Sequence, residues 1–149
     1  MSSTDRSPAG RRRAYFHLQT VAQRLRTTAD RLFVDEAGIT TAQAAALTLI
    51  ASNAGCRQSS VAAQLGQRES AVTAMVGRLE RAGFVERRPC QSDGRAWELW
   101  PTAAGTDALG RLEAALATVN GYIDRAVGPD DVDGVIDALE RLSDLLDAD

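Results

Sequence analysis

The stretch from Ser59 to Arg95 is the feature that most constrains how this chain can fold. Its apolar spacing and its glycines predict two short helices separated by a tight turn, followed at once by a hairpin lined with arginine. Ser92, Asp93 and Gly94 lead to Arg95 at the predicted tip of that hairpin. This order presents one helix end and one basic loop on the same side, which is the geometry a protein uses to hold a duplex at two grooves.

Local signals set the bounds of the helices in this central region. Thr40 and Gln43 have the spacing of a capping box and predict the start of a helix. The two short helices are expected at residues 58–65 and 69–82, with Gly66 as the left-handed residue between them. In the second of these helices, 3.6-residue periodicity places Val72, Val76 and Leu79 inward, with Met75 flanking them. It leaves an open side of Ser70, Thr73, Ala74, Gly77, Arg78 and Arg81.

Alternation with a period of two predicts antiparallel strands at residues 84–88 and 96–100, joined by a loop at residues 89–95. Pro101 is expected to end the second strand, because it has no N–H to donate to the ladder. Thr102 then has the right position to cap the next helix.

Both ends of the chain carry apolar stripes, with residues spaced alternately three and four apart in 11–37 and 103–149. Gly128 and Pro129 divide the second segment into a long helix and a last helix. These stripes are more apolar surface than a domain of this size covers internally, so we infer that they interlock with a second copy of the chain. An intramolecular helix bundle is the alternative.

The predicted fold is therefore mainly α-helical with one small antiparallel β-hairpin, in a single domain over residues 11–149. Residues 40–102 are expected to form one lobe with the two short helices and the hairpin, and the terminal helices at 11–37 and 103–149 to pair with a second copy. Residues 1–10 are rich in Ser, Pro and Gly and lack apolar periodicity, which predicts a disordered tail.

Charge is distributed unevenly along the chain, whose formal net charge is −3. Residues 107–149 hold eleven acidic residues and three arginines, whereas residues 57–95 hold seven arginines and four acidic residues. Because salt screens charges beyond about 8 Å under physiological conditions, the local excess of arginine governs contact with a phosphate backbone.

Several other classes of protein are disfavoured by composition. No apolar run is long enough to span a bilayer and no signal peptide core is present, so we expect a cytoplasmic protein with no membrane partner. Two cysteines and one histidine predict neither a metal site nor a disulfide framework. No nucleophile elbow or phosphate-cradling glycine loop occurs, so we expect no enzyme activity and no cofactor.

Several motifs occur together in register over about 65 residues. They are Thr41–Gln43 with Leu47, Gln58–Gly66, Val72 and Thr73 with Val76, Arg78–Arg87, Asp93–Arg95, and Thr102 with Gly105. In this combination they resemble the MarR family of winged-helix transcriptional regulators. The resemblance implies that residues 40–102 form a winged helix-turn-helix lobe, and that the helices before and after it, at 11–37 and 103–149, form the dimerisation lobe of that family. Arg57 and Arg68 depart from the pattern, because the family usually has Ser, Thr or Asp there as helix caps.

The resemblance implies an obligate homodimer with each recognition helix in the major groove and each wing at the adjacent minor groove. It implies that Asp93 holds an arginine in place while Arg95 reaches the minor groove, and that Arg87 and Arg88 grip phosphates. A helix start that exposes Ser70 and Thr73 can also donate to phosphates and base edges. The residues expected to contact double-stranded DNA are Ser59, Arg68, Ser70, Thr73, Ala74, Arg78, Arg87, Arg88, Asp93 and Arg95.

The resemblance further implies a small aromatic effector that binds between the two lobes and releases a repressor from DNA. Tyr15, Phe16 and His17 are the candidate contacts, with a core or interface role as the alternative. Two other functions stay open at this point. One is a winged-helix module that binds proteins and not DNA, and the other is a regulator that senses oxidants through Cys56 or Cys90.

Overall fold

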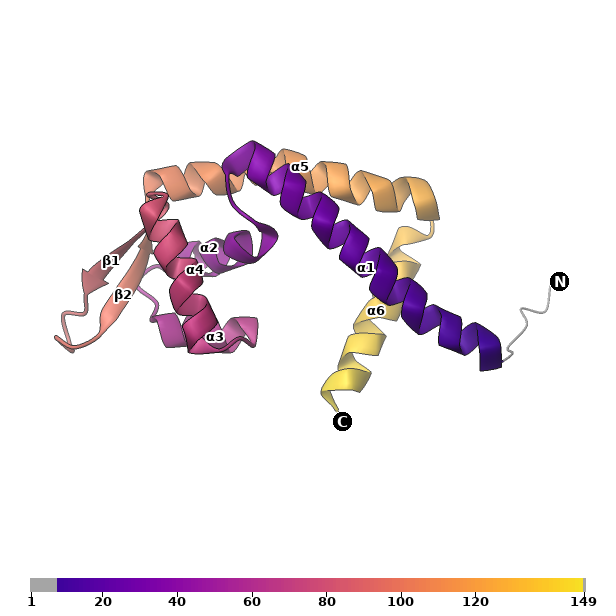
Figure 1. Cartoon of the computed structure of the whole chain (residues 1–149), viewed down its shortest axis with the longest axis horizontal. Helices are drawn as coiled ribbons and strands as arrows, with labels where there is room; N and C mark the ends of the chain where they lie inside the picture. Colours follow the sequence, from indigo (N-terminus) through magenta and orange to yellow (C-terminus); the bar gives the residue numbers. More distant parts are fainter. Residues whose placement is uncertain (1–7, 149) are drawn as a thin grey trace. The chain divides into compact units, whose positions relative to one another are not determined.

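The computed structural model describes the backbone of residues 8–148 and the side chains of residues 13–148. The chain divides into two compact units, residues 1–115 and 116–149. The elements, labelled in Figure 1, are α1 (Pro8–Ala37), α2 (Thr41–Ser52), α3 (Gln58–Leu65), α4 (Glu69–Arg81), β1 (Val85–Pro89), β2 (Trp97–Pro101), α5 (Ala103–Val127) and α6 (Val132–Asp147). The predicted fold class, mainly helical with one antiparallel hairpin, is confirmed.

The start of α1 differs from the predicted tail. The helix begins at Pro8, so residues 8–10 of the tail predicted at 1–10 are helical. Residues 1–7 lie outside the described part of the chain. Proline is well tolerated in a first helical turn, where its missing N–H has no intrahelical partner to lose.

The core of the first unit is built where α2, α3 and α4 meet the hairpin. The spacing correctly predicted the inward residues of α4, because Val72, Val76 and Leu79 are all fully buried. It treated Met75 as a flanking residue, but Met75 is buried as well. The sequence did not identify the end of α1 as core, yet Phe33, Ala37 and the following Ile39 are buried with α2.

Capping fixes the start of α2 and joins it to α1. Thr40 Oγ1 accepts from the Gln43 backbone N–H at 3.3 Å, and Gln43 Oε1 accepts from the Thr40 N–H at 2.9 Å, so the predicted capping box is confirmed. Asp30 of α1 reaches the same place. Its Oδ1 accepts from the Thr41 N–H at 2.8 Å and from Thr41 Oγ1 at 2.6 Å. These bonds set the position of α2 against the end of α1.

The turn between α3 and α4 is the predicted one. Gly66 ends α3 with φ of 60°, in the left-handed region that a residue with a Cβ enters only at a cost. The turn lets Val61 of α3 and Val72 of α4 be buried in the same core. In Figure 1, α3 and α4 lie next to each other, with the hairpin beside α4.

Both strands of the hairpin lie one residue later than predicted. Val85 pairs with Pro101 at one end and Pro89 with Trp97 at the other. The two prolines were expected to be excluded from the strands, but they occupy end positions of a two-stranded ribbon, where no ladder N–H is required of them. The free edge of β2 is partly covered by residues before α3, because the Leu99 N–H donates to the Cys56 carbonyl at 2.9 Å.

A tight junction links the hairpin to α5. Thr102 Oγ1 donates to the Gly83 carbonyl at 2.6 Å and accepts from the Gly105 N–H at 3.0 Å, which confirms the predicted cap. The Thr102 N–H also donates to the Phe84 carbonyl at 3.0 Å. The helix lies so close to this turn that a Cβ on Gly105 would stand 2.2 Å from the Phe84 carbonyl oxygen.

The second unit, residues 116–148 of the described chain, consists of the later part of α5 and all of α6. α6 buries no residue, and its apolar stripe is open along its length. The large exposed apolar side chains of this unit are Leu116, Tyr122, Val135, Ile136, Leu139, Leu142, Leu145 and Leu146. Among the described helices, none combines the length and the hydrophobicity that crossing a membrane requires.

Gly105→Ala is expected to destabilise the fold, because the added Cβ meets a backbone oxygen that cannot rotate away. We expect a loss of about 2 kcal/mol or more, in the range for overpacked sites, measured as a lower midpoint of thermal or urea unfolding. Gly110→Ala is the matched control in the same helix, where the new Cβ meets open space. It should be neutral or stabilising by up to about 1 kcal/mol. Equal midpoints for the two variants would contradict the close approach.

Candidate nucleic-acid interface

α4 has one buried face and one open face. Ser70, Thr73, Ala74, Arg78 and Arg81 are all exposed, on the side that the sequence predicted. Gly77 lies among them and adds no side chain, and a Cβ there would have Arg81 Nη1 at 3.7 Å as its nearest contact. The open face therefore carries small and polar side chains near the start of the helix and arginines toward its end.

The starts of α3 and α4 have no side-chain caps. Arg57 and Arg68 occupy the N-cap positions in extended conformation, and neither side chain accepts a hydrogen bond from its helix. The first amides of both helices are therefore left to other acceptors. A helix start of this kind, next to an arginine, favours an anion such as a phosphate group. Ser59, in the first turn of α3, is exposed at this end.

The Thr73 hydroxyl on α4 is engaged inside the protein. Its Oγ1 donates to the Glu69 carbonyl at 2.8 Å, one turn earlier, and accepts from the Gln58 side-chain amide of α3. The sequence predicted that this hydroxyl would donate to DNA. In the structure its only proton already has an acceptor, so donation to DNA would first require that bond to break.

The wing tip is tied to the start of α3. Asp93 Oδ1 accepts from the Arg95 backbone N–H at 3.2 Å, and Asp93 Oδ2 lies 4.0 Å from Arg57 Nη2. Both side chains of this ion pair are about half exposed, so the pair contributes little to stability. Its effect is on position, since it fastens the loop to a neighbouring element. Among the described residues, the Arg95 guanidinium has no hydrogen bond or ion pair.

Arg87 and Arg88, predicted to grip phosphates, each have a carboxylate partner. Arg87 Nε donates to Glu80 Oε2 of α4 at 2.9 Å, and about a third of each side chain is exposed. Arg88 Nε donates to Glu86 Oε1 at 2.7 Å on the opposite side of the hairpin. The guanidinium groups of these two arginines are therefore already paired with carboxylates, whereas that of Arg95 has no such partner among the described residues.

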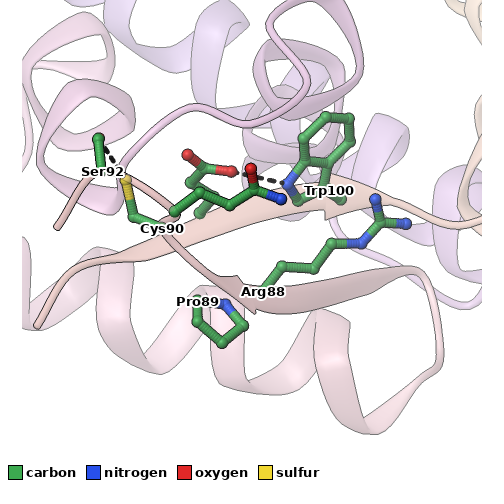
Figure 2. A pocket seen from close by; sticks show the side chains of 7 residues that line it. Arg88, Pro89, Cys90, Ser92 and Trp100 are labelled. Carbon is green, nitrogen blue, oxygen red and sulfur yellow. Dashed lines mark hydrogen bonds between the residues drawn. The ribbon is translucent and has the colours of Figure 1, made fainter. Parts of the chain in front are cut away.

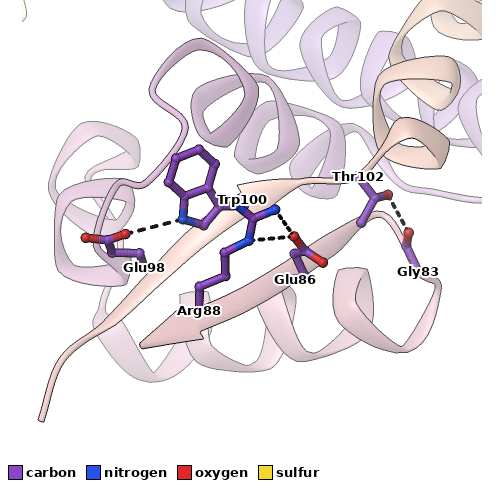
Figure 3. Close-up of polar contacts among 6 residues, drawn as sticks. All are labelled: Gly83, Glu86, Arg88, Glu98, Trp100 and Thr102. Carbon is purple, nitrogen blue, oxygen red and sulfur yellow. Dashed lines mark hydrogen bonds and ion pairs between the residues drawn. The ribbon is translucent and has the colours of Figure 1, made fainter. Parts of the chain in front are cut away.

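Trp100 lies among charged side chains on one side of the hairpin, as Figure 3 shows. The Arg88 guanidinium lies over its ring with Cζ 4.6 Å from the centroid, and the Trp100 Nε1–H donates to Glu98 Oε2 at 3.3 Å. The six-membered part of the ring packs against Gly55, where a Cβ would lie 3.0 Å from Cζ2. Sequence reasoning missed this cluster, although period-two alternation places Glu86, Arg88, Glu98 and Trp100 on one face of the hairpin.

An open hollow of about 850 Å³ adjoins this cluster, shown in Figure 2. It is lined by Arg88, Pro89, Cys90, Gln91, Ser92, Glu98 and Trp100. In this lining the Arg88 guanidinium lies over the face of the Trp100 ring and Glu98 accepts from the Nε1–H at its edge, and both charged groups are engaged with hairpin residues. The hollow lies outside the open face of α4.

Neither cysteine has the environment of an activated thiol. Burial raises the pKa of the Cys56 thiol, and a backbone hydrogen bond offsets only part of this rise. Cys90 is 7% exposed, with its Sγ 3.2 Å from Ser92 Oγ. A raised pKa lowers the thiolate fraction at neutral pH, and the thiolate is the form that reacts with oxidants. The described geometry therefore gives no support to redox sensing.

The candidate effector contacts lie on α1. Tyr15 and Phe16 are more than half exposed, and their rings meet edge to face with centroids 5.4 Å apart. His17 is exposed beside them. These three side chains are therefore not part of the core of the single chain, which was one alternative to effector binding.

Comparison with known proteins gives a consistent result. Residues 37–96 match the sequence profile of the MarR family. No curated protein sequence matches the chain. The chain is similar to the transcriptional repressor CouR, bound to a 23-mer DNA duplex, with 25% identity over 95% of this chain and 99% of CouR and a TM-score of 0.80.

Two further solved structures share the architecture. The PcaV transcriptional regulator from Streptomyces coelicolor is 25% identical over 89% of this chain and 98% of its own length, with a TM-score of 0.71. The S. aureus MepR structure, a DNA complex, is 15% identical over 87% of this chain and 96% of its own, with a TM-score of 0.75, which is a likeness of fold alone.

Proposed function

We propose that the chain is a winged-helix transcription regulator of the MarR family, whose sequence profile its residues 37–96 match, and that it binds specific operator DNA as a homodimer. One observation carries the proposal. The open face of α4 lies next to two uncapped helix starts, and the arginine at the wing tip is without a partner among the described residues. These are donors and positive charges that the protein itself does not satisfy.

The proposed roles follow from the shapes of the two grooves. α4 is wide enough to fill the major groove, where base pairs differ in the groups they present, with Ser70, Thr73, Ala74 and Arg78 toward the bases. Arg68 and Ser59 at the helix starts suit the flanking phosphates. Arg95 on the wing suits the narrow, strongly negative minor groove of A/T-rich DNA. CouR and MepR, two of the similar structures, were solved on DNA, which supports this arrangement.

The arginines differ in how far internal ion pairs neutralise their charge. Arg95 offers its full charge to DNA, with Asp93 holding the loop, whereas Arg87 and Arg88 would have to share theirs with Glu80 and Glu86. A shared guanidinium still attracts a phosphate, but its gain is smaller because part of its charge is already neutralised. We therefore assign the larger contribution to Arg95.

Arg95→Ala is expected to weaken binding to a selected operator by about tenfold or more, measured by fluorescence anisotropy. The slope of log K against log salt should fall by about 1 for each subunit, because a guanidinium in the minor groove neutralises nearby phosphate charge and its removal leaves about 0.9 fewer counterions released. Arg141→Ala makes the same change of charge on the exposed surface of α6 and should leave both quantities unchanged.

If Arg95→Ala together with Arg87→Ala and Arg88→Ala left DNA affinity untouched, the DNA proposal would fail. A winged-helix module that binds only proteins would then be the better description. Absence of any duplex that competes better than random polymer would have the same consequence.

The homodimer is supported by the exposed apolar stripe of α6. Val135, Ile136, Leu139, Leu142 and Leu146 follow helical spacing on one side, and each is at least 36% exposed in the single chain. Monomeric proteins rarely leave a continuous apolar surface of this length in water. A second copy supplies an identical stripe, which is the self-complementary contact that a two-fold dimer needs.

Leu139→Asp should dissociate the dimer, because it places a charge in the centre of the proposed interface. We expect the dimer Kd to rise by about 100-fold or more, since each of two equivalent leucines loses roughly 1.5–3 kcal/mol of burial. Sedimentation velocity measures the change. Gly134→Asp adds the same carboxylate to the same helix at an exposed position with open space around it, and should remain dimeric. A wild-type protein that sediments as a monomer would contradict the proposal directly.

The proposal extends to repression that a small aromatic molecule relieves. CouR is a transcriptional repressor, and PcaV has also been solved in complex with its natural ligand. Release requires a ligand that binds two dimer geometries with different affinities. Tyr15, Phe16 and His17 are the proposed contacts, since they form an exposed aromatic group on α1.

Simple phenols added to the operator complex test this extension. An effector should lower DNA affinity by about 5-fold or more, and Tyr15→Ala should reduce that response without changing affinity in the absence of the phenol. Val21→Ala, at an exposed position of α1, is the control and should leave the response to the phenol unchanged. Phe33 is unsuitable as a control because it is a buried aromatic residue of the same helix. An unchanged affinity at saturating phenol would remove that compound as an effector.

A further inference from the structure

Thr73 stands in the middle of the open face of α4, but its hydroxyl is turned to partners within the protein. A threonine hydroxyl has one proton and two lone pairs. The proton goes to the Glu69 carbonyl at 2.8 Å, and one lone pair receives the Gln58 amide. The side chain as a whole is exposed. The groups that it can offer to a partner without breaking a bond are therefore its γ-methyl and the second lone pair of the hydroxyl, but no longer its proton.

Gln58 fixes this arrangement from another helix. It lies at the start of α3, fifteen residues before Thr73. Because the Thr73 proton is committed to Glu69, the Gln58 atom that faces the hydroxyl must be the donating nitrogen, so the two bonds determine each other. A threonine in a helix has two accessible rotamers, and the pair of bonds selects one of them.

The surroundings of Thr73 allow a close apolar contact. Ala74 beside it is exposed and has only a methyl group, and Gly77 in the next turn has no side chain. Small residues let a helix approach the edges of the bases closely. In the major groove, the apolar group that a base pair presents is the C5-methyl of thymine, and threonine and alanine methyl groups are its usual contacts.

We propose that Thr73 reads the C5-methyl group of a thymine in each half-site, and that Gln58 is its positioning residue. This inference rests on the proposed DNA-binding function and deepens it. It replaces the expectation that Thr73 donates a hydrogen bond to DNA. The competing contact is the second lone pair of the hydroxyl, which could accept from an exocyclic amine of adenine or cytosine.

The test begins with a duplex selected from a randomised pool on the full-length wild-type protein. Each thymine of that duplex is then replaced singly by deoxyuridine, which removes only the methyl group. For one thymine in each half-site we expect wild-type affinity to fall about fourfold, the effect of losing one buried methyl contact.

Two substitutions separate the methyl from the hydroxyl. Thr73→Ser keeps the hydroxyl and loses the methyl, so it should bind the thymine and deoxyuridine duplexes within about 1.5-fold of each other. Thr73→Val keeps a methyl and loses the hydroxyl with its two bonds, but a helical valine is held in one rotamer by its own branching, so it should retain a discrimination of about fourfold. The comparison is a double-mutant cycle between a protein methyl and a DNA methyl, and it does not depend on equal stability of the variants.

Gln58→Met removes the amide donor at nearly constant length and should reduce the thymine preference to below about twofold. Gln64→Met is the matched control, because Gln64 is an exposed glutamine of the same helix that bonds to Ser60. It should leave the thymine preference at about fourfold. Equal loss in both variants would show a general effect on α3 and would overturn the positioning role.

Two results overturn the inference while leaving the proposed function intact. In one, the protein selects a specific duplex but tolerates deoxyuridine at every thymine. In the other, Thr73→Val loses the preference and Thr73→Ser keeps it, which assigns the contact to the hydroxyl. If no sequence is enriched from the pool, the proposed function fails and this inference fails with it.

Discussion

The burial of one face of α4 is the constraint on which the rest of this protein depends. Val72, Val76 and Leu79 are completely buried against α2, α3 and the hairpin, and this fixes the rotation of the helix about its own axis. The residues between them, Thr73, Ala74 and Arg78, can then only face outward. A change of helix rotation would expose core residues, at roughly 1.5–3 kcal/mol for each large side chain. The open face is thus as rigidly defined as the core.

Some of the polar side chains around that face already have partners within the protein, and this affects what binding can gain. Glu80 and Glu86 hold two of the hairpin arginines, and Gln58 holds Thr73. Such pairs reduce the entropy lost when DNA is bound, because the side chains are already ordered. They also lower the net attraction of each arginine for phosphate. The wing-tip Arg95 combines an ordered loop with an unshared charge, since Asp93 bonds to its backbone and not to its guanidinium.

Much of the architecture follows from local patterns in the sequence. The capping box at Thr40, the helix at 58–65 and the left-handed Gly66 are as predicted, because each depends on residues within a few positions of one another. The hairpin was placed one residue too early, because its prolines were taken as strand breakers and the two ends of a ribbon do not need their N–H groups. The core at Phe33 was missed for a different reason: α1 changes from exposed to buried along its length, which a single stripe does not reveal.

The amino-acid sequence by itself determined which residues form helices and strands, which side of α4 is open, and where positive charge is concentrated, because these depend on periodicity and composition. Only the tertiary structure decided which partners the candidate site residues have within the protein. That Gln58 meets Thr73, that Glu80 takes Arg87 and that Asp93 faces Arg57 depends on the packing of separate elements. Side-chain pairs between elements have no fixed spacing in the sequence, since their distance is set by the angle and depth at which the buried faces fit together.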